Sequence, residues 1–357
     1  MIFYLSIFII CLLFSLVSEY SISKELKYIS NLYIFLVIFF ISAFRINVGT
    51  DYFGHYLLYE YIEKGQLSVE YKEPLFLLLC LFAQKTYLGY FFVIGAMSFI
   101  TFYPIYFISK KESSPLIQII YFLSFYLYSQ CLMRQYTSIS LGVLGTYYFL
   151  KEGREKLGLF WIALGAMFHL SFWAYFIVLL LSKYIKLNTF FTIVLIFISY
   201  IVVIKLNIFG KVGNIFGFTE YGRYLESTNK NNQATEIGSG LGVLLRYIQY
   251  IIMYYICIKY INPKKVFNVN MLFFVLFLTD FTSLVFNILV RLRFVYSPLY
   301  ILPFYFTKFS KKNDSIVCIN NYILVSLILI LFLFFIQKDV WGNVPYQSLL
   351  FTEMKYN

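Results

Sequence analysis

In "YISNLYIFLVIFFISAFRINVGTDYFGHY", residues 28–56, an apolar run passes abruptly into a polar segment. Residues 28–44 carry no charge and are long enough to cross a hydrocarbon core of roughly 30 Å as an α-helix. Residues 44–56 then concentrate an arginine, an aspartate and one of the chain's 2 histidines. This pattern predicts a membrane helix that ends in a segment equipped for chemistry.

The composition extends this reading to the whole chain. Hydrophobic residues make up 61% and charged residues 13%, against about 25% charged in soluble domains. We therefore expect an all-α polytopic membrane protein. Residues 2–18 lack a basic start and a small-residue cleavage site, so they are expected to be a span and not a signal peptide. In a membrane protein the distribution of basic residues between the loops indicates the orientation, so the net charge of +12 is no sign of a nucleic-acid partner, and none is expected.

Apolar runs predict about 12 transmembrane helices within a single integral membrane domain, residues 1–357. Segment 74–86 is too short to cross upright and is expected to be re-entrant or half-inserted. Outer loops are expected at 45–73 and 207–240. The predicted spans are 2–18, 28–44, 90–108, 115–131, 133–150, 157–168, 170–182, 189–206, 241–259, 270–289, 293–307 and 320–336.

The distribution of basic residues predicts the orientation. One arrangement gives the cytoplasmic loops 15 Lys and Arg in 45 residues, and leaves the outer segments 8 in 84. Cytoplasmic loops carry such an excess, so both termini are expected outside. The loops assigned to the cytoplasm are 19–28, 109–114, 151–156, 183–188, 259–268 and 308–314.

Polar groups then converge on the outer face. Guanidinium groups match phosphate oxygens with forked donors and stay charged, so a cluster of them favours a phosphate or pyrophosphate ligand. The alternative for Arg134 is that it snorkels at the membrane boundary. The residues at this level are Arg45, Asp51, His55, Arg134, His169, Arg223, Arg291 and Arg293.

An acidic residue lies near the middle of a predicted span. Asp280 needs a partner or a cavity, because an ionised carboxylate there costs several kcal/mol. It begins a polar stripe that continues through Ser283 and Asn287 to Arg291 on one helix face. The stripe is either a hydrogen-bonded clamp between helices or one wall of a substrate cavity.

The two histidines are the candidate proton carriers near neutral pH. His169 lies between two short predicted helices and is either a packed, hydrogen-bonded residue or a catalytic one. Asp51, His55 and Tyr59 are spaced to share one face of a short helix. The neighbourhood of His55 is rich in tyrosine and expected to be exposed, which favours a catalytic role less.

No cofactor signature is present. The chain has no G-x-x-x-x-G-K-[ST] loop, no G-x-G-x-x-G and no H-E-x-x-H, and two separated histidines make no zinc site. Its 5 cysteines show no C-x-x-C spacing. We expect no cofactor and no metal.

An ordered set of motifs resembles a known family. "FRINVGTDYFGHY" is similar to the R-x-x-x-G-x-D-Y-x-x-x-Y segment of EpsG-like, Wzy-type polysaccharide polymerases. The matching segments that follow in order are "KEPLF" at 72–76, "MRQYTSIS" at 133–140, "AMFHLSFW" at 166–173, "RLRFVYSPLY" at 291–300 and "WGNVPYQS" at 341–348.

The resemblance implies a bacterial inner-membrane glycosyltransferase. Such enzymes join undecaprenyl-pyrophosphate-linked repeat units on the periplasmic face into O-antigen, capsule or exopolysaccharide, in some cases with a chain-length regulator. His55 lies outside the family pattern. The residues that the resemblance marks are Arg45, Gly49, Asp51, Tyr52, Arg134, Gln135, His169 and Arg293.

The residues and the resemblance together predict a mechanism. Arg134, Arg291 and Arg293 would neutralise charge on a pyrophosphate leaving group, and His169 or Asp51 would take the proton of the acceptor hydroxyl. A flippase for the same lipid-linked sugar is the chief rival, but it requires a cationic cavity reachable from both sides. The other rivals are an O-antigen ligase, a membrane acyltransferase and a purely structural protein.

Overall fold

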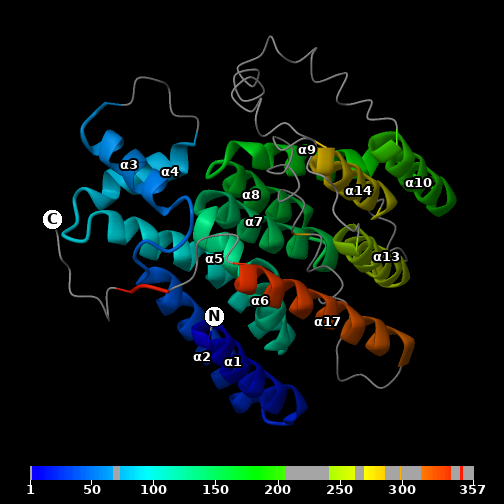
Figure 1. Ribbon diagram of the computed structural model, residues 1–357, viewed down its shortest axis with the longest axis horizontal. Coiled ribbons are helices and arrows are strands. Elements are labelled where there is room, and N and C mark those ends of the chain that lie inside the picture. The colour runs from blue at the N-terminus through cyan, green and yellow to red at the C-terminus, as the bar shows by residue number, and fades with distance from the viewer. Residues whose placement is uncertain are drawn as a thin grey trace. The chain divides into compact units, whose positions relative to one another are not determined.

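The computed structural model describes residues 2–66, 73–205, 241–261, 269–285, 298, 315–338 and 346–348 (Figure 1). Every regular element in these ranges is helical, and one isolated antiparallel bridge joins Arg45 to Ser348. Ile2–Glu19, Lys24–Ala43 and Tyr90–Glu112 are long and apolar enough to cross a membrane, and several shorter helices are apolar. The prediction of an all-α membrane protein is therefore confirmed, whereas the number of crossings stays a prediction.

The described helices follow the predicted spans, but residues 286–289 of span 270–289, and all of span 293–307 except residue 298, lie outside the described residues. The break expected within 157–182 is present, since α8 ends at Ala166 and α9 begins at Trp173. The bounds are α1 Ile2–Tyr20, α2 Lys24–Ala43, α3 Tyr52–Glu63, α4 Pro74–Ala83, α5 Tyr90–Glu112, α6 Leu116–Cys131, α7 Met133–Thr146, α8 Glu155–Ala166, α9 Trp173–Tyr184, α10 Thr189–Lys205, α13 Leu241–Ile261, α14 Val269–Val285 and α17 Ser315–Lys338.

The chain divides into two compact units. The first comprises Met1–Phe172 and Thr307–Asn357, and its described helices are α1 to α8 and α17. The second, Trp173–Phe306, contains α9, α10, α13 and α14, of which α14 packs against the other three. The predicted single membrane domain stays a prediction.

The core of the first unit is formed by α5 and α7, which pack against each other and against α2 and α8. Gly145 of α7 and Gly158 of α8 allow these helices to touch. A Cβ added at Gly145 would lie 2.6 Å from the carbonyl oxygen of Gly158. Small residues permit such close approach between apolar helices. This pairing gives α7, which carries Arg134, a firm position.

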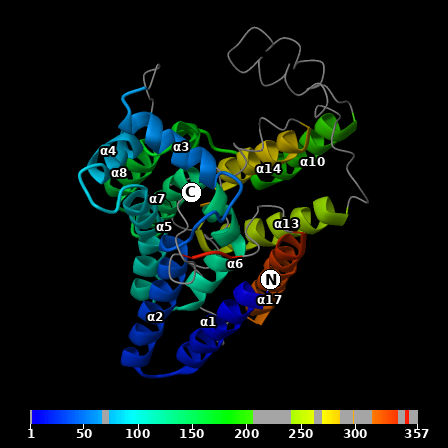
Figure 2. The same cartoon turned by 60° about the vertical axis from the view of Figure 1, so that its left-hand side comes forward.

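Polar contacts gather at two ends of the first unit. At one end Lys111 pairs with Glu152 at 3.0 Å, and Ser114 donates to Glu19. At the other end Tyr346 donates to the carbonyl of Ile41 at 2.6 Å, so residues 346–348 lie beside the end of α2 (Figure 2). Loops predicted to share a side therefore lie together within this unit, as the predicted orientation requires.

The segment after α2 turns sharply against the end of α6. Gly49 has φ +99° and lies against this helix, so that an added Cβ would be 2.6 Å from the carbonyl oxygen of Gln130. The expected short helix is α3, which buries Tyr52, His55, Tyr59 and Ile62. The expectation that His55 is exposed is wrong, because the face of α3 that carries it packs onto the rest of the unit.

We expect Gly49→Ala to destabilise the protein by about 1–3 kcal/mol, because alanine disfavours this φ and its methyl group collides with Gln130. Gly54→Ala is the matched control. It lies within α3 with nothing within 4 Å of an added Cβ, so it should be neutral or slightly stabilising. Thermal unfolding of the purified variants in detergent measures both. Equal melting temperatures for the two variants would contradict the close approach at Gly49.

Candidate functional site

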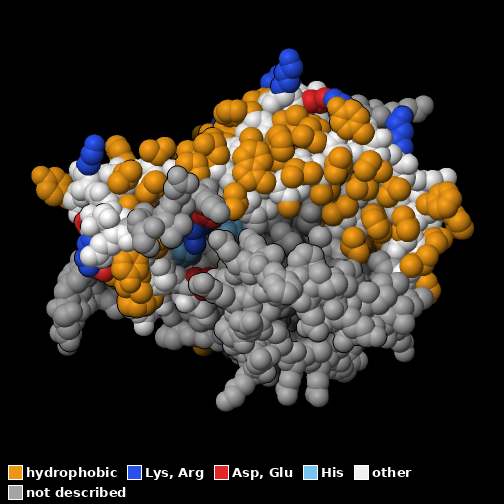
Figure 3. Space-filling model, turned by 90° about the horizontal axis from the view of Figure 1, so that it is seen from above, with side chains coloured by type: hydrophobic (Ala, Val, Ile, Leu, Met, Phe, Trp, Pro, Cys, Tyr) orange, Lys and Arg blue, Asp and Glu red, His pale blue; other side chains and the backbone are white. Residues whose placement is uncertain are grey.

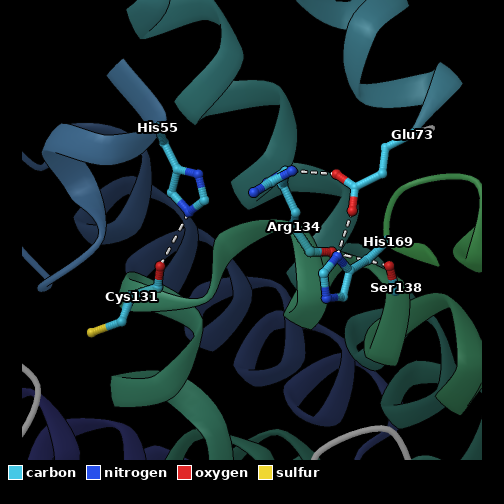
Figure 4. Close-up of polar contacts among 6 residues, drawn as sticks. All are labelled: His55, Glu73, Cys131, Arg134, Ser138 and His169. Atoms are coloured by element: carbon cyan, nitrogen blue, oxygen red, sulfur yellow. Dashed lines mark hydrogen bonds and ion pairs between the residues drawn. The ribbon is translucent and has the colours of Figure 1, made fainter. Parts of the chain in front are cut away.

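Two polar side chains from distant parts of the first unit meet at the carboxylate of a third residue (Figure 4). Nδ1 of His169 lies 2.6 Å from Oε1 of Glu73, and the other carboxylate oxygen, Oε2, accepts a hydrogen bond from Nη1 of Arg134. Glu73 therefore bridges a guanidinium group and an imidazole ring. Charge-assisted bonds of this kind are shorter and stronger than neutral ones and fix orientation.

The local structure explains how these residues meet. Glu73 comes directly before α4, which starts at Pro74, and His169 follows the end of α8. The backbone N–H of Leu75 donates to the carbonyl of Met167 at 3.3 Å, which ties the start of α4 to the end of α8. Arg134 lies in the first turn of α7, just after the break that separates it from α6.

The site is enclosed and yet reachable. Glu73 is only 7% exposed, whereas the side chains of Arg134 and His169 are 23% and 18% exposed. The guanidinium of Arg134 lies over the buried ring of Phe76, 5.3 Å from its centroid, a favourable cation–π arrangement. Figure 3 shows charged and histidine side chains lying together among apolar ones. The guanidinium of Arg134 and the imidazole ring of His169 are therefore partly accessible to a ligand.

The geometry suits His169 to proton transfer. Because the carboxylate of Glu73 accepts, Nδ1 of His169 donates, and in the neutral ring Nε2 then carries the lone pair. Among the described residues, none binds this Nε2 atom. A carboxylate behind the ring holds the tautomer and stabilises the imidazolium that forms when Nε2 takes a proton. His169 thus has the arrangement of a general base.

His55 lies on the other side of Arg134 and has a different character (Figure 4). It is 8% exposed, and its Nε2 lies 3.3 Å from the carbonyl oxygen of Cys131. Burial first, and then the positive charge of Arg134, lower the pKa of His55 to about 3. The ring therefore stays neutral at physiological pH, which makes His55 a poor general base.

Arg45 is buried, in contrast to the outward-facing arginine that the sequence predicts. It is 2% exposed, and its Nη1 donates to the carbonyl and the hydroxyl oxygen of Ser42 at 2.8 and 2.9 Å. Its Nη2 contacts the sulfur of Met133 at 3.3 Å. Arg45 thus joins the end of α2 to α7, and its charge acts on the site from below the surface.

Other predicted residues surround this cluster or lie away from it. Asp51 precedes α3, and no hydrogen bond among the described residues links its side chain to Arg134. Tyr52 and Gln135 are buried, and Tyr90 donates to the carbonyl of Tyr52 at 3.3 Å. Asp280 lies in α14, but its side chain is outside what the structure describes, as are the whole of Arg223, Arg291 and Arg293.

The residue that sequence analysis missed is Glu73. It is the last residue of the expected outer loop 45–73, in which Glu70 and Lys72 also lie. One signal was present, since Glu73 comes directly before Pro74 and the apolar run that follows. An acidic residue at such a boundary needs a partner when it is buried.

An ion-paired cluster thus lies within an apolar helical chain. The chain matches the EpsG family over residues 28–348, nearly its whole length, and it belongs to that family. EpsG-like polymerases are part of the Wzy-type group, so the family indicates a polysaccharide polymerase kind of function. No curated protein and no solved structure matches the chain.

Proposed function

We propose that the protein is a glycosyltransferase that polymerises oligosaccharide repeat units carried on undecaprenyl pyrophosphate. The observation that carries the proposal is the carboxylate of Glu73, which holds the cation of Arg134 and the imidazole of His169 side by side. Transfer of a sugar from a lipid pyrophosphate requires both groups: one neutralises the leaving group and the other takes a proton. Family membership supports the same reaction.

The proposed step balances as follows. Nε2 of His169 takes the proton of an acceptor hydroxyl, and the oxygen attacks the anomeric carbon of the donor sugar. The bond from that carbon to the phosphate oxygen breaks, and its electron pair leaves with undecaprenyl pyrophosphate. Arg134 neutralises the developing charge. Arg291 and Arg293, for which the sequence predicts the same role, lie outside the described residues. Glu73 stabilises the imidazolium, and the products are a lengthened glycan and the free lipid pyrophosphate.

The remaining residues have supporting roles in this proposal. Asp51 is the second candidate base, and Tyr52 and Gln135, which are both buried, are proposed to support the binding of the substrate. Arg223 and Asp280 are proposed to contact the sugar or the pyrophosphate. The positioning of His169 by a carboxylate favours it over Asp51 as the base.

The proposed location is the inner membrane of a bacterium, with the site on the periplasmic face. Loops rich in Lys and Arg, such as 109–114 and 151–156, meet at the end of the first unit away from Arg134, which supports this orientation. The product would be O-antigen, capsule or exopolysaccharide, and a chain-length regulator is a possible partner. A ligase shares the donor and remains the second candidate, because Arg134 and His169 suit its chemistry too.

We expect Arg134→Lys to lower the polymerisation rate nearly as much as Arg134→Ala, by roughly 10²- to 10³-fold. A lysine offers one compact charge and cannot hold Glu73 and a phosphate through a planar fork. His169→Ala should lose a similar factor, since general-base catalysis contributes about 10²- to 10⁴-fold. The measurement is glycan length in membranes that contain equal amounts of each variant.

The matched control is Arg154→Lys, in the loop between η1 (Tyr147–Lys151) and α8, which should keep the wild-type glycan length. Wild-type glycan length in both Arg134→Ala and His169→Ala would refute the proposed site. A deletion strain separates the candidate functions, because a surface glycan of a single repeat unit indicates a polymerase. Complete loss of the surface glycan indicates a ligase or a flippase.

Labelling with a membrane-impermeant thiol reagent tests the orientation. Gln66→Cys, after α3, should be modified from outside, and Ser113→Cys, after α5, should be protected until the cells are opened. Both positions are exposed, and the described native cysteines Cys11, Cys80, Cys131 and Cys257 are buried, which keeps the background low. The reverse pattern would place the site on the cytoplasmic side.

A further inference from the structure

His55 presents a hydrogen-bond acceptor that the proposed reaction has not used. A backbone carbonyl can only accept, so the contact with Cys131 requires that Nε2 of His55 carries the hydrogen. Nδ1 then holds the lone pair. In the described part of the chain, nothing donates to this Nδ1 atom. The tautomer of His55 is thus fixed by the fold, and one acceptor is left over next to Arg134.

The surroundings keep this acceptor unprotonated. Arg134 and Arg45 both disfavour a positive charge on the ring, and burial does so more strongly. The bond to Cys131 and the charge of Glu73 act in the opposite sense, but each is weaker than burial and than the charge of Arg134. The lone pair on Nδ1 is therefore available at neutral pH. A group that binds there must bring a hydrogen.

His55 and Arg134 consequently have opposite requirements. The guanidinium has only donors, and it takes atoms that accept, such as phosphate oxygens. Nδ1 takes a hydroxyl hydrogen and repels a deprotonated phosphate oxygen, because two lone pairs would face each other. The guanidinium lies between His55 and Glu73 (Figure 4), so the two kinds of site are adjacent. A sugar phosphate carries both kinds of atom close together.

We propose that His55 binds a hydroxyl group of the donor sugar through Nδ1 while Arg134 binds the adjoining phosphate. Two contacts of opposite polarity fix the direction in which the sugar lies, and the reactive carbon then faces His169. His55 is a binding residue in this scheme and takes no proton. The inference rests on the proposed function, because it assigns a role in recognising the same lipid-linked sugar.

Two substitutions distinguish the roles of the two ring nitrogens of His55. In His55→Gln the amide nitrogen can replace Nε2 and keep the bond to Cys131, but the acceptor at Nδ1 is lost. In His55→Asn the amide oxygen can replace Nδ1, but the bond to Cys131 is lost. We expect His55→Gln to raise KM about tenfold with kcat little changed, as removal of one binding contact should. His55→Asn should retain more of the affinity.

The assay uses membranes of each variant and lipid-linked repeat units extracted from a strain that lacks this protein. Tyr59→Phe, one turn further along the same buried face of α3, is the packing control and should be unchanged. Wild-type KM in both His55→Gln and His55→Phe would overturn the inference. If the wild-type protein makes no polymer from the extract, or Arg134→Ala makes it normally, the proposed function itself fails.

Nitrogen NMR provides a readout that does not depend on turnover. The chain has 2 histidines, so the ring signals of ¹⁵N-histidine protein are assigned by the loss of one set in His55→Phe. We expect His55 to be the neutral Nε2–H form without titration between pH 5 and 8, and its Nδ1 signal to shift when the extracted lipid-linked units are added. Titration in that range, or an Nδ1 signal that does not move although the units bind, would contradict the inference.

Discussion

The site depends on one buried carboxylate. Glu73 holds Arg134 with one oxygen and His169 with the other, and these residues come from the start of α4, the start of α7 and the end of α8. Removing one member of such a buried group leaves a charge or a polar atom without its partner, which is costly. The carboxylate therefore does more than balance a charge, since it fixes how two reactive side chains lie relative to each other.

The rest of the first unit supports this group. The α7–α8 contact through Gly145 and Gly158 holds the two helices that flank the carboxylate. Gly49 lets the segment after α2 press against Gln130, which brings α3 and His55 to the other side of Arg134. The buried Arg45 connects α2 to α7 through its contacts with Ser42 and Met133. Apolar packing thus builds a frame that holds these polar side chains in place.

Hydropathy was sufficient to predict the helices, because a span in lipid must satisfy its own backbone and therefore reads as a long apolar run. The break near His169 and the short helix α3 were also predictable from spacing. The pairing of Glu73 with Arg134 was not predictable, because the two residues are 61 positions apart and hydrophobic periodicity gives no information on contacts between distant residues. Burial of His55 and Arg45 was missed for the same reason, because it depends on packing between helices that are distant in the sequence.

The central claim is that Glu73 acts through His169, and a double-mutant cycle tests it most directly. Initial polymerisation rates would be measured in membranes for Glu73→Gln, His169→Ala and the double variant. We expect strong coupling: Glu73→Gln should cost much less once His169 is absent, with an interaction free energy of roughly 1–3 kcal/mol. Independent effects that simply multiply in the double variant would contradict the claim.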